Sequence, residues 1–500
     1  MGYTVPHILA GTARLEPAAD LSHPITNPAT GDVIGRVPYA SRALCMEAVE
    51  NARTAFPGWA ATPPIRRARI LNRFRELLER HTDELAEIVT REHGKTLEDA
   101  RGSVARGIEA VEFYSALTSR LQGQFSLNAA GGIDCCTFPQ PLGVCAGVSP
   151  FNFPVMVPLW MMAPAIACGN TFIIKPSEQD PSATVRLVEL LKEAGLPDGV
   201  VQCLQGNRET VDTLLAHPDI EAFTAVASTP VAEAIYRTAT ANGKRAHTFG
   251  GAKNHCVVMP DADMDMAADA ITGAAFGSAG ERCMALSVVV SVGEDSARRL
   301  TDALITRVKN IRVGAGNEPG VDMGPLISAA HRERVLAFID EGVKEGARLL
   351  VDGRGFRHKD FPNGFFTGPT LFDDVREDMQ IYQQEIFGPV LVMLTVKTFE
   401  DALALVNRHA YGNGTAIFTR SGYFAREYST RVNVGMVGVN IPIPVPVATH
   451  PFGGWKRSSF GDTFMHGDES FHFYTRRKSV TSRWPTSRED TSAFVMPVND

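Results

Sequence analysis

The clearest periodic pattern in the chain is helical and lies toward its N-terminal end. From about residue 64 to residue 117, apolar side chains recur three and four positions apart, and in the run 69–89 opposite charges recur at the same spacing. This spacing gathers the apolar side chains on one helical face and adds ion pairs along the surface. The segment is therefore predicted to be amphipathic helix.

From residue 144 onward, short apolar runs alternate with amphipathic segments. FIIKP, residues 172–176, is typical of a buried strand, and the helical segment 184–195 that follows ends at a glycine, with Pro197 beyond it. The further predicted elements are strand 200–205, helix 209–217, strand 221–227 and helix 231–243. This alternation predicts a mostly parallel sheet with helices on both faces.

A second alternating series begins near residue 255. It contains a helix that leads to residue 283, a strand at 287–293, a helix ending near residue 309 and further units to about residue 440. Two other segments are extended: 118–141 is an excursion between the early helices and the first sheet, and 471–484 alternates in the manner of a strand. Such exposed strands could pair with each other or with a neighbouring subunit.

Composition and charge exclude several classes of protein. With 500 residues, 44% of them hydrophobic and 21% charged, the chain is a soluble, folded protein large enough for two or three domains. A formal net charge of −7 with scattered basic residues argues against a nucleic-acid binder. The most apolar stretch, 153–168, is short for a membrane span and holds three prolines, so a buried helix is expected there.

The cysteines and the start of the chain bear on the compartment. Eight cysteines with no CxxC spacing favour reduced thiols in a cytoplasmic enzyme, without a disulfide framework and without a metal site. The first twenty residues carry no secretory or transit pattern. Neither GxGxxG nor a Walker A loop occurs, so a dinucleotide, if one binds, must bind by another arrangement.

Four motifs in a defined order carry a family resemblance. PFNFP at 150–154, KPSE at 175–178, GERCMA around Cys283 and EIFGPV at 385–390 resemble the motif set of the aldehyde dehydrogenase superfamily, and the likeness runs along nearly the whole chain. EHGKT (92–96), GAKNH (251–255), GNGTAIF (412–418) and VGVNIPIPVPV (437–447) resemble more narrowly the methylmalonate-semialdehyde dehydrogenases, the CoA-acylating branch.

The resemblance implies an α/β architecture with three parts. These are an NAD-binding domain (1–122 and 142–250), a catalytic domain (251–445) and a small β element for oligomerisation (123–141 and 466–485). It also implies a homotetramer, a dimer of dimers, with small-molecule substrates.

Cys283 is the candidate nucleophile. An unpaired cysteine in an apolar context is usually a small hydrophobic residue, but the motif match favours a thiol that attacks an aldehyde. The preceding Arg282 is expected to lower the thiol pKa, and Gly277 and Gly280 are expected to let the backbone approach a ligand. By resemblance, the oxyanion formed on attack is held by the side-chain amide of Asn152 and the backbone N–H of Cys283.

By resemblance, six side chains bind the cofactor. Lys175 and Glu178 match positions that contact the adenosine ribose. A carboxylate that accepts hydrogen bonds from this ribose favours NAD over NADP. The alternative is that the two residues form a surface ion pair. Ser228 matches a phosphate-contacting position, although its neighbour Ala227 replaces the usual glycine. The remaining three positions, at the nicotinamide, are Phe151, Glu385 and Phe387.

One departure from the superfamily pattern indicates how the product leaves. Hydrolytic members carry a glutamate thirty-four residues before the cysteine, a position that holds Phe249 here, and a shift of one residue gives Thr248. Neither side chain can activate water, whereas a thiol is partly ionised at neutral pH. Coenzyme A is therefore the expected acyl acceptor. A distant carboxylate that restores hydrolysis to a free acid is the alternative, and an inactive binding protein is a third hypothesis.

Two arginines indicate the substrate class. Arg282 adjoins the nucleophile, and Arg106 matches a second substrate-binding arginine of the CoA-acylating branch. Arginine holds carboxylates in bidentate fashion, so a semialdehyde that bears a carboxylate is implied. After oxidation, the thioester carbonyl can act as an electron sink for the loss of CO2. Malonate and methylmalonate semialdehyde cannot be told apart at this level, because one methyl group is worth only about 1–3 kcal/mol.

Overall fold

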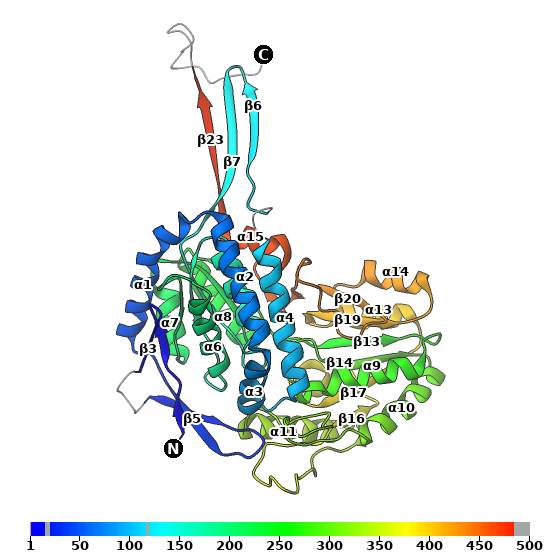
Figure 1. Cartoon of the computed structure of the whole chain (residues 1–500). Coiled ribbons are helices and arrows are strands. Elements are labelled where there is room, and N and C mark those ends of the chain that lie inside the picture. The colour runs from blue at the N-terminus through cyan, green and yellow to red at the C-terminus, as the bar shows by residue number, and fades with distance from the viewer. Residues whose placement is uncertain (1, 16–20, 117–119, 485–500) are drawn as a thin grey trace.

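Two α/β bodies and a projecting three-stranded arm make up the part of the chain that is described, residues 2–15, 21–116 and 120–484 of a computed structural model (Figure 1). Each body is built on one large sheet, and the two sheets belong to different stretches of the sequence. The predicted α/β fold class is confirmed.

The first sheet has eight strands in the order β22-β12-β11-β8-β9-β10-β2-β3. Its strands are β2 (His7–Leu9), β3 (Thr12–Arg14), β8 (Val144–Val148), β9 (Thr171–Lys175), β10 (Val201–Cys203), β11 (Ile220–Val226), β12 (Arg245–Phe249) and β22 (Ser459–Phe460). The central five are parallel, and every residue of β9 is buried because helices cover both faces.

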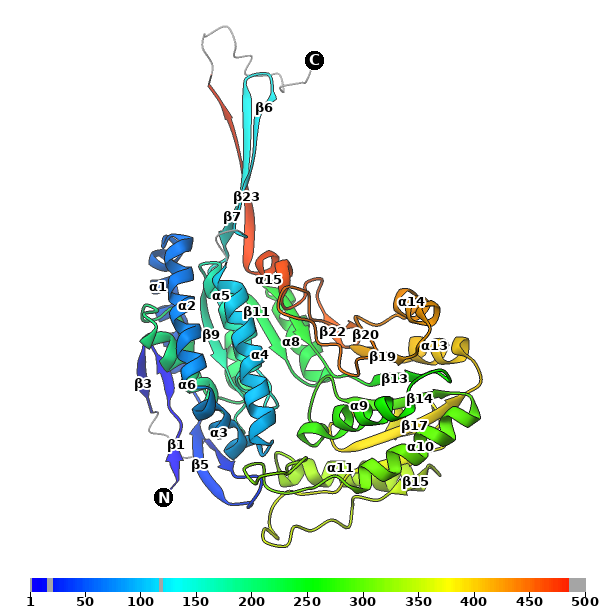
Figure 2. The same ribbon diagram turned by 45° about the vertical axis from the view of Figure 1, so that its right-hand side comes forward.

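The helices of the first body lie on the two faces of this sheet (Figure 2). They are α1 (Arg42–Ala60), α2 (Pro64–Arg80), α3 (Thr82–His93), α4 (Leu97–Ser115), α5 (Met156–Ala167), α6 (Ser182–Glu193), α7 (Arg208–Ala216) and α8 (Thr229–Ala241). The predicted helical segment 64–117 is thus α2 to α4, broken at His81 and at the left-handed Gly94. The apolar stretch 153–168 contains α5, all of whose residues are buried. No helix in the described ranges is both long and apolar enough to cross a membrane.

The chain order of the first sheet matters for ligand binding. From β8 the chain moves to β9 and β10 on one side and then returns to β11 and β12 on the other. Such a reversal leaves a crevice at the carboxyl ends of the two central strands, which is where open α/β sheets bind ligands. The sheet therefore has a dinucleotide-binding layout without the glycine fingerprint that usually marks one.

The second sheet has seven strands in the order β15-β16-β17-β14-β13-β19-β20. These are β13 (Asn254–Val258), β14 (Leu286–Val292), β15 (Arg348–Val351), β16 (Thr370–Asp373), β17 (Val390–Val396), β19 (Gly414–Phe418) and β20 (Met436–Val439). Only β15 is antiparallel among them. The helices are α9 (Met264–Phe276), the short η2 (Gly277–Gly280), α10 (Glu294–Lys309), α11 (Ala329–Lys344), α12 (Gln380–Gln383), α13 (Phe399–Arg408) and α14 (Gly422–Arg431).

Two small sheets complete the bodies. One has the order β1-β5-β4, and the other pairs β18 with β21. Their strands are β1 (Tyr3–Thr4), β4 (Ser22–Thr26), β5 (Val33–Pro38), β18 (Tyr411–Gly412) and β21 (Trp455–Lys456).

The arm projects from the first body and joins segments far apart in the sequence (Figure 1). β6 (Gln124–Ala130) and β7 (Ile133–Pro141) form a hairpin, and β23 (Thr475–Arg483) pairs antiparallel with β7 along its whole length. Of the two predicted pairings, the one within the chain is therefore present. The predicted strand 471–484 is wrong at its start, because 471–474 belongs to α15 (Gly467–Tyr474), whose aromatic side chains are buried against the body.

Asn170 ties the root of the arm to the first sheet. Its Oδ1 accepts from the backbone N–H groups of Leu142 (2.7 Å) and Gly143 (3.0 Å). Its Nδ2 donates to the carbonyls of Ala165 (3.2 Å) and Tyr474 (2.9 Å), and the side chain is fully buried. One side chain thus joins the start of β8, the end of α5 and the start of β23.

We expect Asn170→Ala to lower the free energy of unfolding by about 3 kcal/mol, because buried backbone groups lose their partners. Urea unfolding followed by fluorescence measures the change. The control is Asn242→Ala at the exposed end of α8, expected to stay within about 0.5 kcal/mol of the parent. Equal midpoints for Asn170→Ala and the parent would show that these bonds do not hold the arm.

Candidate active site

A cavity of about 1320 Å³ opens at the reversal point of the first sheet. Its walls include the residues that directly follow β8, β9, β11 and β12, together with residues of α11 and of the loop before β17. The N-terminus of α8 also lines it, which is a favourable place for a phosphate group. The volume exceeds the roughly 300–1,000 Å³ of ordinary small-ligand pockets.

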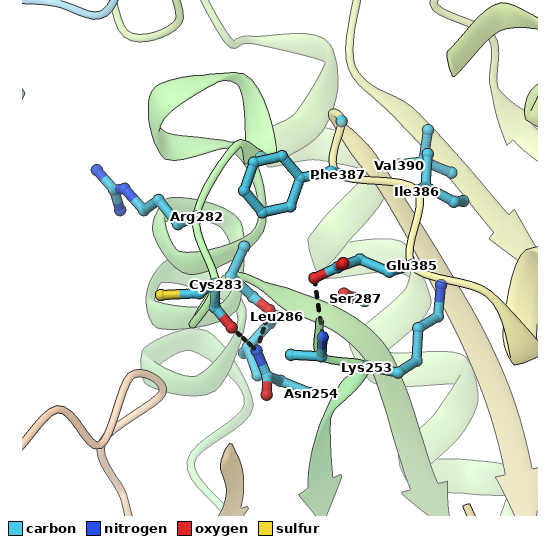
Figure 3. Close-up of a pocket in the computed structure, with 14 residues that line it drawn as sticks. Lys253, Asn254, Arg282, Cys283, Leu286, Ser287, Glu385, Ile386, Phe387 and Val390 are labelled. Atoms are coloured by element: carbon cyan, nitrogen blue, oxygen red, sulfur yellow. Dashed lines mark hydrogen bonds between the residues drawn. The ribbon is translucent and has the colours of Figure 1, made fainter. Parts of the chain in front are cut away.

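Eight of the ten predicted site residues line this one cavity. They are Phe151, Asn152, Lys175, Glu178, Ser228, Cys283, Glu385 and Phe387. The two that do not are Arg106 and Arg282, although Arg282 and Cys283 share a smaller cavity of about 10 Å³ (Figure 3).

The backbone at Cys283 is held by two asparagine amides. Nδ2 of Asn254, at the start of β13, donates to the Cys283 carbonyl (2.9 Å), and Nδ2 of Asn413, just before β19, donates to the same oxygen (3.0 Å). Asn254 Oδ1 also accepts from the N–H of Gly414 (3.0 Å), which links the two strands. The cysteine is therefore fixed by the sheet behind it.

The glycines before Cys283 make room for protein groups. Gly280 has φ +73°, and a Cβ there would lie 2.3 Å from the carbonyl oxygen of Gly388. A Cβ at Gly277 would lie 2.7 Å from the guanidinium of Arg282. The expectation that these glycines admit a ligand is wrong, because the space belongs to Arg282 and to the loop before β17.

Asn152 is held in place by hydrogen bonds to Lys95 and Glu281. Its backbone carbonyl accepts from Nζ of the buried Lys95 (2.8 Å), which also lies over the Phe153 ring. Its Nδ2 donates to the carbonyl of Glu281, two residues before the cysteine (3.0 Å). The amide retains a second N–H, so the arrangement is compatible with the predicted oxyanion contact.

The expectation that Arg282 lowers the pKa of Cys283 is wrong. Its guanidinium pairs with Asp99 on α4 (2.8 Å). Burial raises the pKa of the Cys283 thiol to about 12, and the nearby charge of Glu385 adds to this, while backbone N–H groups and Lys95 act in the opposite direction. In the free protein the cysteine is therefore a thiol.

Arg106 holds a proline-rich segment. It pairs with Glu109 and donates to the carbonyls of Val445 and Pro446, the latter at 2.7 Å. Glu109 in turn accepts from the N–H of Ala448 (2.9 Å). This arginine thus has a structural role that its place in the sequence did not reveal, because the carbonyls that it binds lie more than three hundred residues away.

At one end of the cavity, Glu385 and Phe387 lie on the loop before β17. Glu385 Oε1 accepts from the N–H of Ala252 (2.8 Å). Phe387 has φ +60°, an outlier for a bulky residue, and its carbonyl accepts from Nε2 of His331 on α11 (2.7 Å). The Phe387 ring meets Phe151 edge-on, with centroids 5.7 Å apart.

At the other end, Lys175 and Glu178 form an ion pair of 2.7 Å. The alternative of a surface pair does not describe it, because Lys175 is buried and both side chains line the cavity. Burial raises the pKa of Glu178, but Lys175 outweighs this and the net shift is downward, so the group is a carboxylate at neutral pH.

The positions where a water-activating glutamate is expected are filled by other groups. Phe249 ends β12 and is buried, with its ring near those of His247 (5.2 Å) and Phe452 (6.5 Å). Thr248 donates to the carbonyl of Ala232 (2.8 Å) and is fully buried. Glu281 is fully buried too, and its side chain does not line the cavity.

Four residues of the site escaped the sequence prediction: Lys95, Asn254, Glu281 and His331. Lys95 and Asn254 lie inside the quoted motifs EHGKT and GAKNH. The motifs identified these two segments. Only the structure shows that Lys95 bonds to the Asn152 carbonyl and that Asn254 bonds to the Cys283 carbonyl. Within the described ranges no cluster of three or more His, Cys, Asp or Glu side chains could hold a metal ion.

A doubly wound sheet, a cavity at its reversal point and a cysteine on the cavity wall are features of a thiol-dependent oxidoreductase. The chain belongs to the aldehyde dehydrogenase family, whose model matches residues 16–480.

Relatives extend over almost the whole chain. A malonate-semialdehyde dehydrogenase of Pseudomonas aeruginosa is 51% identical over 99% of both chains. The acylating methylmalonate-semialdehyde/malonate-semialdehyde dehydrogenase of Homo sapiens, a mitochondrial protein, is 45% identical over 98% of this chain and 92% of its own.

Solved structures agree with this. A Sinorhizobium meliloti protein crystallised with NAD has a TM-score of 0.96 and 51% identity, over 98% of this chain and 100% of that one. The methylmalonate-semialdehyde dehydrogenase of Oceanimonas doudoroffii has a TM-score of 0.95 and 50% identity, over 97% and 99%.

The raised pKa of Cys283 predicts slow, pH-dependent alkylation of the free protein. Only the thiolate reacts, so the rate of Cys283 modification by iodoacetamide should rise about tenfold per pH unit between about pH 7 and 10. Peptide mass spectrometry after timed quenching measures it. A rate that levels off near pH 8.5 would contradict the burial argument.

Asn413→Ala should lower the rate of aldehyde oxidation about tenfold, because the Cys283 carbonyl loses one of its two amide donors. Stopped-flow NADH formation is the measurement. Asn407→Ala is the matched control, since the half-buried Asn407 does not line the cavity and its side chain bonds to backbone groups of Arg431 and Asn433. If both variants oxidise aldehyde at the parent rate, the asparagine pair does not position the thiol.

Proposed function

We propose that the protein is an NAD-dependent, CoA-acylating dehydrogenase of methylmalonate or malonate semialdehyde. The overall reaction is semialdehyde + CoA + NAD⁺ → propionyl-CoA or acetyl-CoA + CO2 + NADH. The observation that carries this proposal is the single cavity on which the candidate cofactor residues and Cys283 meet while no glutamate occupies position 248 or 249.

The cavity suits NAD at both ends. Glu178 is ionised and lines the end where an adenosine ribose is expected, and a carboxylate there would repel a 2′-phosphate. The N-terminus of α8 with Ser228 suits the diphosphate. Bound NAD supplies the hydride acceptor. The NAD complex of the Sinorhizobium meliloti relative supports this choice of cofactor.

Cys283 and Asn152 carry the oxidation. The sulfur attacks the aldehyde carbon, and the free N–H of the Asn152 amide together with the Cys283 N–H stabilises the oxyanion, each such donor being worth a factor of about 10² to 10³. Loss of hydride leaves an acyl group on Cys283. Burial holds the free thiol protonated, so the thiolate must form when the cavity fills.

The substrate carboxylate is assigned to Arg282 and Arg106. The contact of Arg282 with Asp99 uses one of its five N–H groups, which leaves donors for a second carboxylate. A carboxylate two carbons from the oxidised centre can leave as CO2, with the thioester carbonyl taking up the electron pair. The resulting enolate takes up one proton, equivalent to the one that the Cys283 thiol released, and a propionyl or acetyl group remains on Cys283.

The acyl group leaves to CoA. Phe249 and Thr248 supply no base for water, whereas a thiol is a few per cent ionised at neutral pH. The names of the acylating relatives support this. Hydrolysis to a free acid stays the rival function, and it requires another carboxylate.

We assign each part of the chain a role in this reaction. We propose an NAD-binding domain (1–122 and 142–250), a catalytic domain (251–445) and an oligomerisation element (123–141 and 466–485). The last corresponds in the structure to the arm with α15. Its exposed Phe125 and Leu127 on β6 support assembly into a homotetramer, a dimer of dimers. None of the eight cysteines, all of which lie in the described ranges, forms a disulfide, and this suits the cytoplasm.

The proposal predicts that steady turnover requires CoA. With malonate semialdehyde and NAD alone, NADH should appear as one burst per active site, and CoA should restore continuous NADH, CO2 and acetyl-CoA formation. Cys283→Ala should give none of the three products. Continuous NADH at the full rate without CoA would instead favour the hydrolytic enzyme.

Phe249→Glu should introduce hydrolysis. A carboxylate at this position can activate water, so free acid should form without CoA at least tenfold faster than in the parent. Liquid chromatography of the acid measures it, and Phe249→Leu, which adds space but no base, should stay at the parent level. Equal acid from both variants would show that access of water, and not a missing base, limits hydrolysis.

A further inference from the structure

Glu385 is the one carboxylate without a cationic partner among the carboxylates that line the large cavity in the described ranges. Glu178 pairs with Lys175, Glu377 with Arg408 and Asp378 with Arg376. Glu385 Oε1 accepts a backbone N–H, and no bond to its Oε2 is seen. A carboxylate oxygen is thus available inside the cavity.

Glu385 also lines the same cavities as Cys283. Both residues line the large cavity and the cavity of about 10 Å³, which is about the size of one water molecule. Figure 3 shows the Cys283 sulfur directed away from the Glu385 carboxylate, with the two residues on opposite sides of the view. Glu385, Phe387 and Cys283 are thus all exposed to a group that occupies the large cavity.

The surroundings of Glu385 make its carboxyl group a weaker acid than an ordinary glutamate. Burial raises its pKa to about 7, although the Ala252 N–H and the charges of Lys253 and Arg334 act in the opposite direction. Lys253 donates to the carbonyls of Ile381 and Gln384, and Arg334 donates to those of residues 385 and 386. His331 and Cys283 are the other titratable groups on this part of the wall.

We propose that Glu385 is the base that takes the proton from the CoA thiol when this thiol attacks the acyl group on Cys283. The S–H bond of CoA breaks as its sulfur bonds to the thioester carbon, and the proton passes to the Glu385 carboxylate. The C–S bond to Cys283 then breaks, and the Cys283 thiolate recovers the proton from Glu385 across the small shared cavity. The net change is acyl-Cys283 + CoA-SH → acyl-CoA + Cys283-SH, and it rests on the proposed function.

The pKa values of the two possible acyl acceptors, CoA and water, explain why Glu385 can deprotonate the thiol of CoA. A group with a pKa of about 7 lies only about 1.5 units below an ordinary thiol near 8.5, so the proton transfer is close to balanced. Water, at about 15.7, lies almost nine units above it. The same carboxylate is therefore an effective base for CoA and a poor one for hydrolysis.

Glu385 then acts in both halves of the reaction. In the first it is assigned to the nicotinamide ribose, and in the second it meets the thiol that enters along the same cavity. Because both molecules are assigned to the cavity that Glu385 and Cys283 line, NADH must leave before CoA attacks. The two roles follow each other and do not compete.

The test isolates the second half-reaction. Parent and Glu385→Gln enzymes are acylated with semialdehyde and saturating NAD, the NADH burst is recorded, and the acyl-enzyme is freed of nucleotide by rapid gel filtration. CoA is then added between pH 6 and 9.5, and acyl-CoA is quantified after quenching. Glu377→Gln, which removes a carboxylate of the same cavity that is paired with Arg408, is the matched control.

Glu385→Gln should transfer its acyl group about 30-fold more slowly than the parent at pH 7. Without the base only the ionised fraction of CoA reacts, and this fraction is about 3% for an ordinary thiol at pH 7. The rate of this variant should rise about tenfold per pH unit and approach the parent rate near pH 9, while the parent levels off above pH 7. Glu377→Gln should keep the parent profile. A full burst shows that each variant is folded and acylated.

Two results would overturn the assignment: an unchanged transfer rate in Glu385→Gln, or a loss by the same factor at every pH, which is what a distorted pocket gives. Failure of the proposed function looks different, because the parent acyl-enzyme itself would then release free acid before CoA is added.

Discussion

The backbone carbonyl of Cys283 is the point on which the site depends. Two asparagines from neighbouring strands of the second sheet donate to it, and the carbonyl of Glu281, two residues earlier, accepts from Asn152 of the first body. Hydrogen bonds to both bodies thus meet within three residues. Because these groups are buried, each would leave an unsatisfied partner if the loop moved, and the sulfur is therefore held where the cavity of the first sheet ends.

Burial has two consequences for the chemistry. It raises the pKa of Cys283 to about 12, so the free protein is protected from the oxidation and alkylation that a permanent thiolate invites. It also raises the pKa of Glu385 to about 7, which gives the cavity a carboxylate matched to a thiol. With Phe249 at the position of a water-activating glutamate, the balance between the two acyl acceptors favours sulfur.

Much of this was visible in the sequence. The alternation of apolar and amphipathic segments predicted both sheets, since most strands are buried on two faces and most helices on one. The family resemblance marked eight residues that line one cavity. What escaped prediction depends on contacts between distant residues. Arg282 looked like a neighbour of the thiol, but Asp99, far away in sequence, takes its charge. Residues 471–474 alternated like a strand but dock as a helix.

The most direct measurement is the intact mass of the protein during one turnover. With NAD and malonate semialdehyde but no CoA, the account predicts a stable gain equal to one acetyl group, located on Cys283 by peptide mapping, and its complete loss within one turnover time after CoA is added. If no covalent adduct forms on Cys283, or if the adduct disappears in buffer as fast as it does with CoA, the central claim is contradicted.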